Sequence, residues 1–342
     1  MDRFPHLYGH EKLKKMWEKL YESGKMPHTM ILYGEEGLGK TTAALELAGL
    51  LTGMEKQIWD FWESTKPDEA EKESVFVFAN RCVWYLKPLN MELKIEQFRQ
   101  FLEEMPSFDE RPHVCIIDEA QTMKDPIANS LLKTLEEPIG NLYFILIAHD
   151  ITALLPTIIS RSERFPFFAL AESEYKRLLR EHKEKYKLAS DIDEEMAYQL
   201  SEGNPGVTRE LCTQEKSGQL DKAMQFWEML THSSTPFSEL QEGKMSDRKN
   251  FLQRLRWIIL IGRDLMVLGE TGKTDLIQCL AMADREKAIA SSWKGGRAEA
   301  ALCFLEEAKK AVTLSINVNI VWDAVLIHLE HIRKDDSAWN RL

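Results

Sequence analysis

The residues best suited to chemistry form a glycine-rich run near the start of the chain, GEEGLGKT at 34–41. It follows a short apolar run at 29–33 and opens a stretch of helical periodicity at 40–52. Glycines at this spacing let the backbone turn tightly so that several N–H groups face one anion, and a helix N-terminus adds partial positive charge. The spacing and its context predict a loop that binds the phosphates of a nucleotide.

Two side chains of this loop have predicted roles. Lys40 is expected to meet the β- and γ-phosphates, and the hydroxyl of Thr41 to ligate Mg²⁺. The residues predicted to hold the nucleotide are Gly34, Gly37, Gly39, Lys40, Thr41, Thr42 and Asp118. The expected cofactor is therefore ATP or ADP with Mg²⁺, with Thr41 and Asp118 at the metal.

A second run, VCIIDEA at 114–120, ends an apolar segment in two acids. Asp118 is predicted to hold the Mg²⁺ shell, and Glu119 to orient and deprotonate an attacking water. Acids at strand ends are mostly solvated, so this run alone is weak evidence for a magnesium site. Its position downstream of the phosphate loop supports that role. A third run, GETGKT at 269–274, follows a helical pattern rather than a strand, and is interpreted as an interhelical turn.

The elements that must position these residues are buried strands and amphipathic helices. Apolar runs at 29–33, 113–117 and 142–148 predict strands, and helical periodicity at 11–23 and about 126–136 predicts helices. Such alternation indicates a parallel sheet with helices on both faces, as an α/β domain over 1–168.

Strand signals fade after this domain. A small helical domain is predicted over 169–212, with helices at about 172–185 and 191–201. An all-helical domain follows over 213–342. Its predicted helices are 219–231, 247–268, 275–291, 296–312 and 317–334. The polar segment 232–247 is interpreted as a loop, and the tail after Lys334 as frayed.

The amino-acid composition restricts the binding partners and the cellular compartment that we expect for this protein. The formal charge of −11 argues against a dedicated duplex-binding domain, because phosphate neutralisation needs a basic surface. The five cysteines are widely spaced, without a CxxC pair, which favours reduced thiols in a cytoplasmic protein. The chain has no apolar signal segment and no apolar stretch long enough to span a membrane.

Several of these motifs together resemble the clamp-loader subunits of the AAA+ family of bacterial DNA polymerase III. They are the phosphate loop, IIDEAQTM (116–123), NSLLKTLEEP (129–138), LLPTIISRS (154–162) and GNPG (203–206). The resemblance implies an AAA+ domain, a helical lid and a helical collar within a five-subunit ring that places a sliding clamp on primed DNA. It implies motor (tau/gamma) and delta subunits as partners.

Within that family, the chain resembles the delta-prime type. Motor subunits carry an arginine where this chain has Gly206, although Arg209 lies nearly one helical turn further on. Motor subunits also end a sensor strand in polar threonines, whereas here the strand ends in Ala148 and His149. His149 could sense the nucleotide or be a surface histidine. The resemblance therefore implies nucleotide binding, with at most weak ATP hydrolysis by this component of the polymerase.

The family's arginine finger corresponds to Arg161 in Ser160-Arg161-Ser162. In relatives this arginine reaches into a neighbour's ATP site, where a guanidinium stabilises charge on the transferring phosphoryl group. The predicted catalytic residues are Arg161 and Glu119.

One departure from the family concerns zinc. Many delta-prime subunits insert a four-cysteine zinc module after the phosphate-loop helix, but the region at about 53–95 contains only Cys82. No zinc site is therefore expected. Trp59 and Trp62 in this insert either pack locally, which their apolar bulk favours, or face a partner.

The residues thus favour a delta-prime-like stator that supplies Arg161 in trans. Two alternatives stay open: an ATP-hydrolysing motor subunit, which the intact Lys40 and Asp118 favour, and a stand-alone homo-oligomeric AAA+ ATPase.

Overall fold

A computed structural model describes residues 3–70, 72–89, 92–104, 110–136, 141–188, 194–212, 217–232, 248–313 and 317–334. It separates into two compact units, one of Met1–Lys187 with Ser201–Glu210 and one of Leu188–Leu200 with Leu211–Leu342. The division into three domains at 168 and 212 stays a prediction. No helix in the described residues is long and apolar enough to cross a membrane.

The first unit is built on a six-stranded sheet with the order β2-β3-β4-β5-β1-β6. The strands are β1 (Thr29–Tyr33), β2 (Val75–Phe78), β3 (Val83–Leu86), β4 (His113–Ile117), β5 (Leu142–Ala148) and β6 (Glu163–Pro166). All pairings are parallel except that of β2 with β3, which is antiparallel. The predicted strands at 29–33, 113–117 and 142–148 are confirmed as the parallel strands β1, β4 and β5. The sequence did not predict β2, β3 or β6, and β2 runs antiparallel because the short turn at 79–82 cannot hold a parallel crossover.

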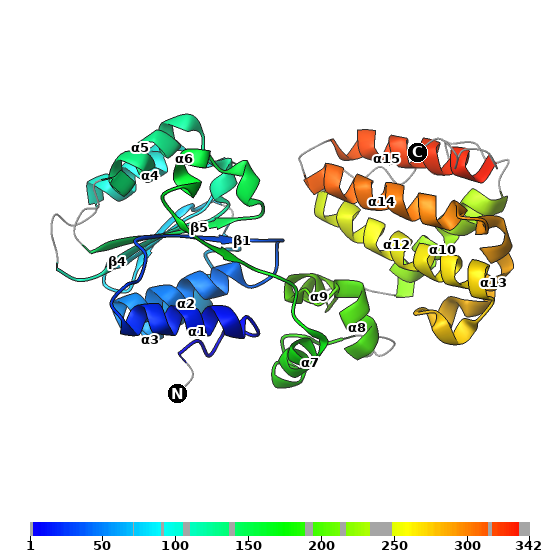
Figure 1. Ribbon diagram of the computed structural model, residues 1–342, viewed down its shortest axis with the longest axis horizontal. Helices are drawn as coiled ribbons and strands as arrows, with labels where there is room; N and C mark the ends of the chain where they lie inside the picture. The colour runs from blue at the N-terminus through cyan, green and yellow to red at the C-terminus, as the bar shows by residue number, and fades with distance from the viewer. Residues whose placement is uncertain are drawn as a thin grey trace. The chain divides into compact units, whose positions relative to one another are not determined.

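Helices cover both faces of the sheet, as predicted (Figure 1). One face packs against α1 (Glu11–Glu22), α2 (Lys40–Thr52) and α3 (Glu55–Thr65). The other packs against α4 (Ile95–Glu104), α5 (Asp125–Glu136) and the short α6 (Pro156–Ile159). Successive strand residues enter opposite cores, as Ile116 and Ile117 of β4 do.

The sheet brings the predicted site residues to one edge. In the parallel register Tyr33 of β1 lies opposite Ala148 of β5, and Ile117 of β4 opposite Leu146. The carboxyl ends of β1, β4 and β5 therefore meet at the same edge, where ligands bind in sheets of this type.

Three shorter helices follow the sheet: α7 (Glu172–Glu181), α8 (Glu194–Ser201) and α9 (Pro205–Cys212). The first ends earlier than the predicted 185, and α9 has no counterpart among the predicted helices. A buried hydrogen bond of 2.6 Å joins the hydroxyls of Tyr175 on α7 and Thr208 on α9. The backbone N–H of Leu170 donates to the carbonyl of Gly203. These contacts hold the start of α9 beside the sheet unit.

The second unit has five longer helices among its described residues: α10 (Ser217–His232), α12 (Arg248–Thr271), α13 (Ala283–Ala290), α14 (Arg297–Thr313) and α15 (Val318–Lys334). Its core includes three fully buried tryptophans, Trp227, Trp293 and Trp322. The helices predicted at 219–231, 247–268, 296–312 and 317–334 are confirmed within a few residues. The predicted loop from 233 onward and the tail from 335 onward lie outside the described residues.

The predicted helix at 275–291 is wrong in its first half. Gly272 has a φ of 68°, which ends α12, and two 3-10 turns at Thr274–Leu276 and Leu280–Met282 precede α13. The Asp264 carboxylate accepts the N–H groups of Gln278 and Cys279 at 2.9 and 2.7 Å, so these residues cannot join a continuous helix. The interpretation of GETGKT as an interhelical turn is confirmed, since α12 ends within it.

Candidate nucleotide-binding site

The glycine-rich loop has the tight turn expected from its sequence. It leads from Tyr33 at the end of β1 to Lys40 at the start of α2, and Gly39 is the helix N-cap. The glycines have φ values of 143° (Gly34), 84° (Gly37) and 88° (Gly39). Thr41 and Thr42 lie half-buried in the first turn of α2. A helix N-terminus thus opens at the loop, the arrangement that favours an anion.

The ammonium group of Lys40 is folded back onto this loop. Its Nζ donates to the carbonyl oxygens of Gly34 at 2.7 Å and Glu35 at 2.5 Å, and the residue is buried. Burial lowers the pKa of Lys40 to about 8, although the charges of Asp118 and Glu36 oppose this. The loop therefore holds a partly desolvated cation, which favours binding of an anion.

Asp118 lies directly after β4 and is also engaged. Its Oδ2 accepts the hydroxyl of Tyr85 at 2.5 Å, and its Oδ1 accepts the N–H of Glu119 at 2.9 Å. Burial raises the pKa of Asp118, while these two hydrogen bonds and the charge of Lys40 act to lower it. The predicted phosphate and magnesium ligands, Lys40 and Asp118, thus lie within electrostatic reach of each other.

Tyr85 is a site residue that the sequence did not single out. It belongs to β3, whose residues VWYL are all buried and have the pattern of a core strand. Only the pairing of β3 with β4 places its hydroxyl beside Asp118. No local signal in the sequence distinguishes this tyrosine from an ordinary core aromatic.

Glu119, the predicted base, has a φ of 46°, in the left-handed region. Non-glycine residues held there cost roughly 1 kcal/mol or more, and such residues cluster at functional sites. The carbonyl of Glu119 accepts the hydroxyl of Thr122 at 2.8 Å, which starts the 3-10 turn Ala120–Thr122.

The end of β5 offers little to a phosphate. Ala148 is fully buried, and its carbonyl accepts the N–H of Gly34 at 3.2 Å, so it contributes a backbone contact to the loop. The exposed His149 donates its N–H to the side chain of Gln121 at 3.4 Å, and a positive charge on its ring would lower the pKa of Asp118. Of Ala148 and His149, only His149 has a polar side chain, and its ring lies within electrostatic reach of Asp118.

The start of α9 lies in direct contact with the phosphate loop. The N–H of Gly206 donates to the carbonyl of Gly37 at 3.0 Å, and Asn204 Nδ2 donates to the carbonyl of Glu36 at 2.7 Å. A Cβ built on Gly206 would lie 2.4 Å from the Cα of Gly37. The position that carries the motor arginine in the family is therefore filled here by backbone in van der Waals contact with the loop.

Arg209 makes a different contact. Its Nη2 lies 2.9 Å from Oε1 of Glu69, which belongs to the insert after α3, and both side chains are about half exposed. The guanidinium beside Glu69 holds the pKa of that carboxyl below its usual range. This arginine thus ties α9 to the insert.

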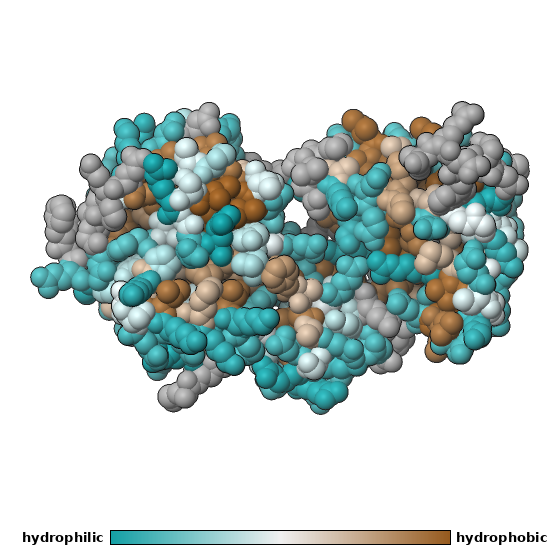
Figure 2. Space-filling view, viewed as in Figure 1, coloured by the Kyte–Doolittle hydropathy of each residue, from teal (hydrophilic) through white to brown (hydrophobic). Residues whose placement is uncertain are grey.

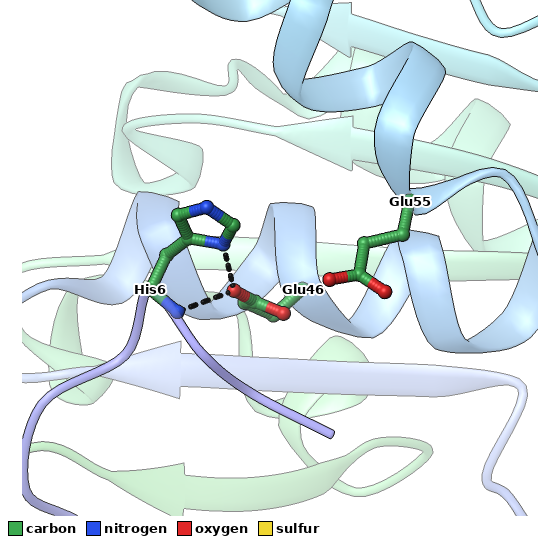
Figure 3. Close-up of side chains that lie close together, drawn as sticks. All are labelled: His6, Glu46 and Glu55. Carbon is green, nitrogen blue, oxygen red and sulfur yellow. Dashed lines mark hydrogen bonds and ion pairs between the residues drawn. The ribbon is translucent and has the colours of Figure 1, made fainter. Parts of the chain in front are cut away.

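The insert and the N-terminal segment pack against the phosphate-loop helix. The backbone N–H of His6 donates to Oε1 of the buried Glu46 on α2 at 2.9 Å, and His6 Nδ1 lies 2.7 Å from the same oxygen (Figure 3). Trp59 stacks on the His6 ring at 4.0 Å, and Trp62 meets Tyr85 edge-on at 4.9 Å. Both tryptophans therefore pack locally, as their bulk predicts.

Arg161 lies apart from these residues. It is exposed, and its Nη1 donates to the carbonyl of Thr157 at 3.2 Å. It lies two residues before β6, whose first residue Glu163 pairs with Met30 near the amino end of β1. Arg161 thus lies at the opposite edge of the sheet from the phosphate loop, so the structure does not bring it to the site in its own chain.

Comparisons with known proteins agree with this arrangement. A family model described as "DNA polymerase III, delta subunit" matches residues 9–171. The delta-prime subunit of DNA polymerase III from Bacillus subtilis is 24% identical over 331 residues, covering 93% of this chain and 95% of the relative. Replication factor C small subunit 1 of Pyrobaculum islandicum is 29% identical, over 57% of this chain and 53% of its own length.

The chain thus spans only about half the length of the first curated relatives that it matches. Among solved structures, a DNA polymerase III gamma subunit-related protein of Thermotoga maritima is similar, with a TM-score of 0.48 and 17% identity over 93% of this chain and 99% of that one. The family model and the alignment along nearly the whole delta-prime subunit show that the chain is similar to clamp-loader subunits of DNA polymerase III.

Proposed function

We propose that this chain is a delta-prime-like subunit of a DNA polymerase III clamp loader, which helps to load the sliding clamp onto primed DNA during replication in the cytoplasm. It acts as a stator that binds nucleotide and hydrolyses it weakly at most. The observation that carries this proposal is the contact of Gly206 with Gly37. It leaves no room for a cationic side chain from α9 at the place where motor subunits use one.

The loop and its neighbours fit a nucleotide with Mg²⁺. The turn of Gly34, Gly37 and Gly39, the buried cation of Lys40 and the N-terminus of α2 suit phosphate oxygens. Thr41 and Asp118 would hold Mg²⁺, which neutralises charge between the phosphates when bound. Tyr85 competes for Asp118 and must share or release Oδ2 for that role.

Arg161 is proposed to act on a neighbouring subunit. Its exposure and its place at the far edge of the sheet suit contact with a second chain rather than with Lys40. There the guanidinium would stabilise the charge that develops on the γ-phosphoryl oxygens, which is worth several powers of ten in rate. The partners are motor (tau/gamma) and delta subunits in a hetero-pentamer.

A motor role is the second candidate, because one observation favours it. Lys40, Asp118 and Glu119 lie together at the sheet edge, with Glu119 in a strained left-handed conformation typical of functional positions. Against it, Ala148 and Gly206 give no polar side chain to a γ-phosphate. A homo-oligomeric ATPase stays a third alternative.

Native mass spectrometry of the chain, alone and with the motor and delta subunits of its organism plus ATP, is the first test. A monomer that enters the pentamer as one copy supports the stator proposal, whereas a homo-oligomer that ignores those subunits contradicts it.

Variants in the assembled complex then separate the two clamp-loader roles. Arg161→Ala should lower DNA-stimulated ATPase at least tenfold, because an arginine finger contributes about 10³ or more. The matched control Arg164→Ala changes a neighbouring exposed arginine of β6 and should have little effect. Lys40→Ala should leave most clamp loading intact. Loss of loading with Lys40→Ala and none with Arg161→Ala would instead identify a motor.

A further inference from the structure

The helical unit contains a buried cluster of three acidic groups that takes no part in the nucleotide site. Asp264 of α12, Cys279 of the α12–α13 connector and Glu286 of α13 place one ligand atom each within 4.8 Å of one another. All three are almost fully buried, at 1%, 0% and 0% exposure. Two carboxyls and a thiol this close repel one another unless a proton or a cation lies between them.

Glu286 is the side chain that ordinary packing leaves unexplained. In the part of the chain that the structure describes, neither carboxylate oxygen of Glu286 has a hydrogen-bond partner. A buried carboxyl without hydrogen bonds or a counter-ion is costly, so such groups nearly always have partners. Burial and the charge of Asp264 raise the pKa of Glu286 to about 8.

The neighbouring arginines serve other carboxylates. Arg285 donates to Glu228 at 2.7 and 2.8 Å and to Asp221 at 2.6 Å. Arg263, next to Asp264 in the chain, lies 3.3 Å from Glu306. Among the described residues, neither Asp264 nor Glu286 forms an ion pair with a lysine or arginine. The cluster therefore contains acidic side chains without a cationic partner.

Asp264 and Gln278 show that the groups are held in place. Both oxygens of Asp264 accept backbone N–H groups, from Gln278 and Cys279, which fixes the carboxylate and draws the connector toward it. The side-chain oxygen of Gln278 is buried and has no partner among the described residues. Because Gln278 is the chain neighbour of Cys279, this oxygen is the fourth donor that the proposal below assigns.

We propose that Asp264, Cys279 and Glu286 bind one structural Zn²⁺ ion, with Gln278 as the fourth ligand. A thiolate with carboxylate oxygens suits Zn²⁺ and disfavours Mg²⁺ and Ca²⁺, which take oxygen ligands. Tetrahedral zinc ligands lie roughly 3.5 Å apart, so side chains already within 4.8 Å need only small rotations. On binding, the Cys279 thiol and any protonated carboxyl release their protons to solvent.

The ion would fasten the connector between α12 and α13. This connector exposes two large side chains, Leu276 at 54% and Leu280 at 66%, and Figure 2 shows a hydrophobic patch over it. The expectation of no zinc came from the insert at about 53–95, which lies elsewhere; this proposal revises it for the helical unit only.

A second cluster, His6, Glu46 and Glu55, differs in its contacts, although Oε2 of Glu46 is also buried without a hydrogen-bond partner among the described residues. Its ligand atoms also lie within 4.8 Å of one another, but His6 is already bonded to Glu46, and His6 and Glu55 are exposed to water (Figure 3). It therefore provides an internal comparison.

The test uses the full chain, treated with a chelator, desalted, and titrated with Zn²⁺ and with Co²⁺. Wild type should retain one Zn²⁺ per chain and show the Co²⁺–thiolate absorption that a cysteine ligand produces. Cys279→Ser and Glu286→Gln should each weaken retention at least about tenfold. The controls Cys303→Ser, at an exposed cysteine, and His6→Ala should behave like wild type.

Circular dichroism checks that each variant is folded, because only the metal content of a folded variant can be compared with that of wild type. Wild type that holds no Zn²⁺ overturns the proposal, as does metal content that is equal in folded Glu286→Gln and wild type. Zinc lost in His6→Ala but kept in Cys279→Ser would also overturn it, by placing the ion in the other cluster.

Discussion

The phosphate-loop edge of the sheet and the acid cluster of the helical unit both bury ionisable groups, but with opposite charge patterns. At the sheet edge a buried ammonium, Lys40, lies near the carboxylate of Asp118, and both have hydrogen-bond partners. In the helical unit Asp264 and Glu286 are both acids, and Glu286 has no partner among the described residues.

This difference indicates what each region is suited to receive. The sheet edge balances its own charge and adds backbone donors, which suits an anion that arrives with its own metal ion. The acid cluster holds carboxyl groups in a dry place with no cationic partner among the described side chains, which suits a cation that replaces their protons. The two regions should therefore respond to different ligands, and each variant below should alter one of them and spare the other.

The largest effect is expected from Lys40→Met, which removes the cation of the sheet edge. Loss of a charge-assisted contact to phosphate should weaken Mg²⁺–ATP and Mg²⁺–ADP binding about 100-fold, or roughly 3 kcal/mol. Isothermal titration calorimetry measures this, with Lys25→Met as the control at an exposed lysine. Zinc retention should not change. Nucleotide affinity within threefold of wild type would refute the role of Lys40.

A smaller effect is expected from Gly206→Ala, which tests the backbone contact with Gly37. The new Cβ would lie 2.4 Å from the Gly37 Cα, and such overpacking costs about 2 kcal/mol. Alanine favours a helix more than glycine does, so any destabilisation must come from this contact. The midpoint of urea unfolding should fall.

The matched control is Gly218→Ala on α10, where a Cβ meets nothing within 4 Å. It should leave stability unchanged or raise it by up to about 1 kcal/mol. An equal change in the midpoint of urea unfolding for the two alanine variants would show that Gly206 is not in tight contact with Gly37.

The same two regions show what could be predicted from the sequence. The phosphate loop, β1 and α2 lie in one contiguous stretch, so spacing and periodicity predicted them correctly. Contacts across the fold had no such signal: Tyr85 reaches Asp118 only through strand pairing, and Gly206 reaches Gly37 only once α9 is placed.

The helical unit shows the same limit. Asp264, Cys279 and Glu286 match no ligand motif, and the helical pattern at 275–291 hid the turns that Asp264 imposes on the connector. The edge strand β2 runs antiparallel for a similar reason, because a turn of left-handed residues at Ala79, Asn80 and Arg81 decides its direction. Periodicity predicts which residues are buried, but it does not predict which buried polar groups meet.

The smallest effect is expected from Glu228→Gln, which tests the claim that Arg285 is used by α10 rather than by its neighbour Glu286. The Arg285 guanidinium beside Glu228 holds the pKa of that carboxyl below its usual range. Stabilisation from a lowered carboxyl pKa is fully present above the unfolded value of about 4.3, and is lost as pH falls through the folded value. The variant should therefore be less stable by about 1 kcal/mol near pH 7 and match wild type near pH 3, since the pair is partly exposed.

Urea unfolding at both pH values measures this, with Glu299→Gln, exposed on α14, as the control. A difference that persists near pH 3 would mean that the ion pair is not its source. If the variant also lowered zinc retention more than about twofold, Arg285 would have turned toward Glu286 and supplied the cation in place of a metal.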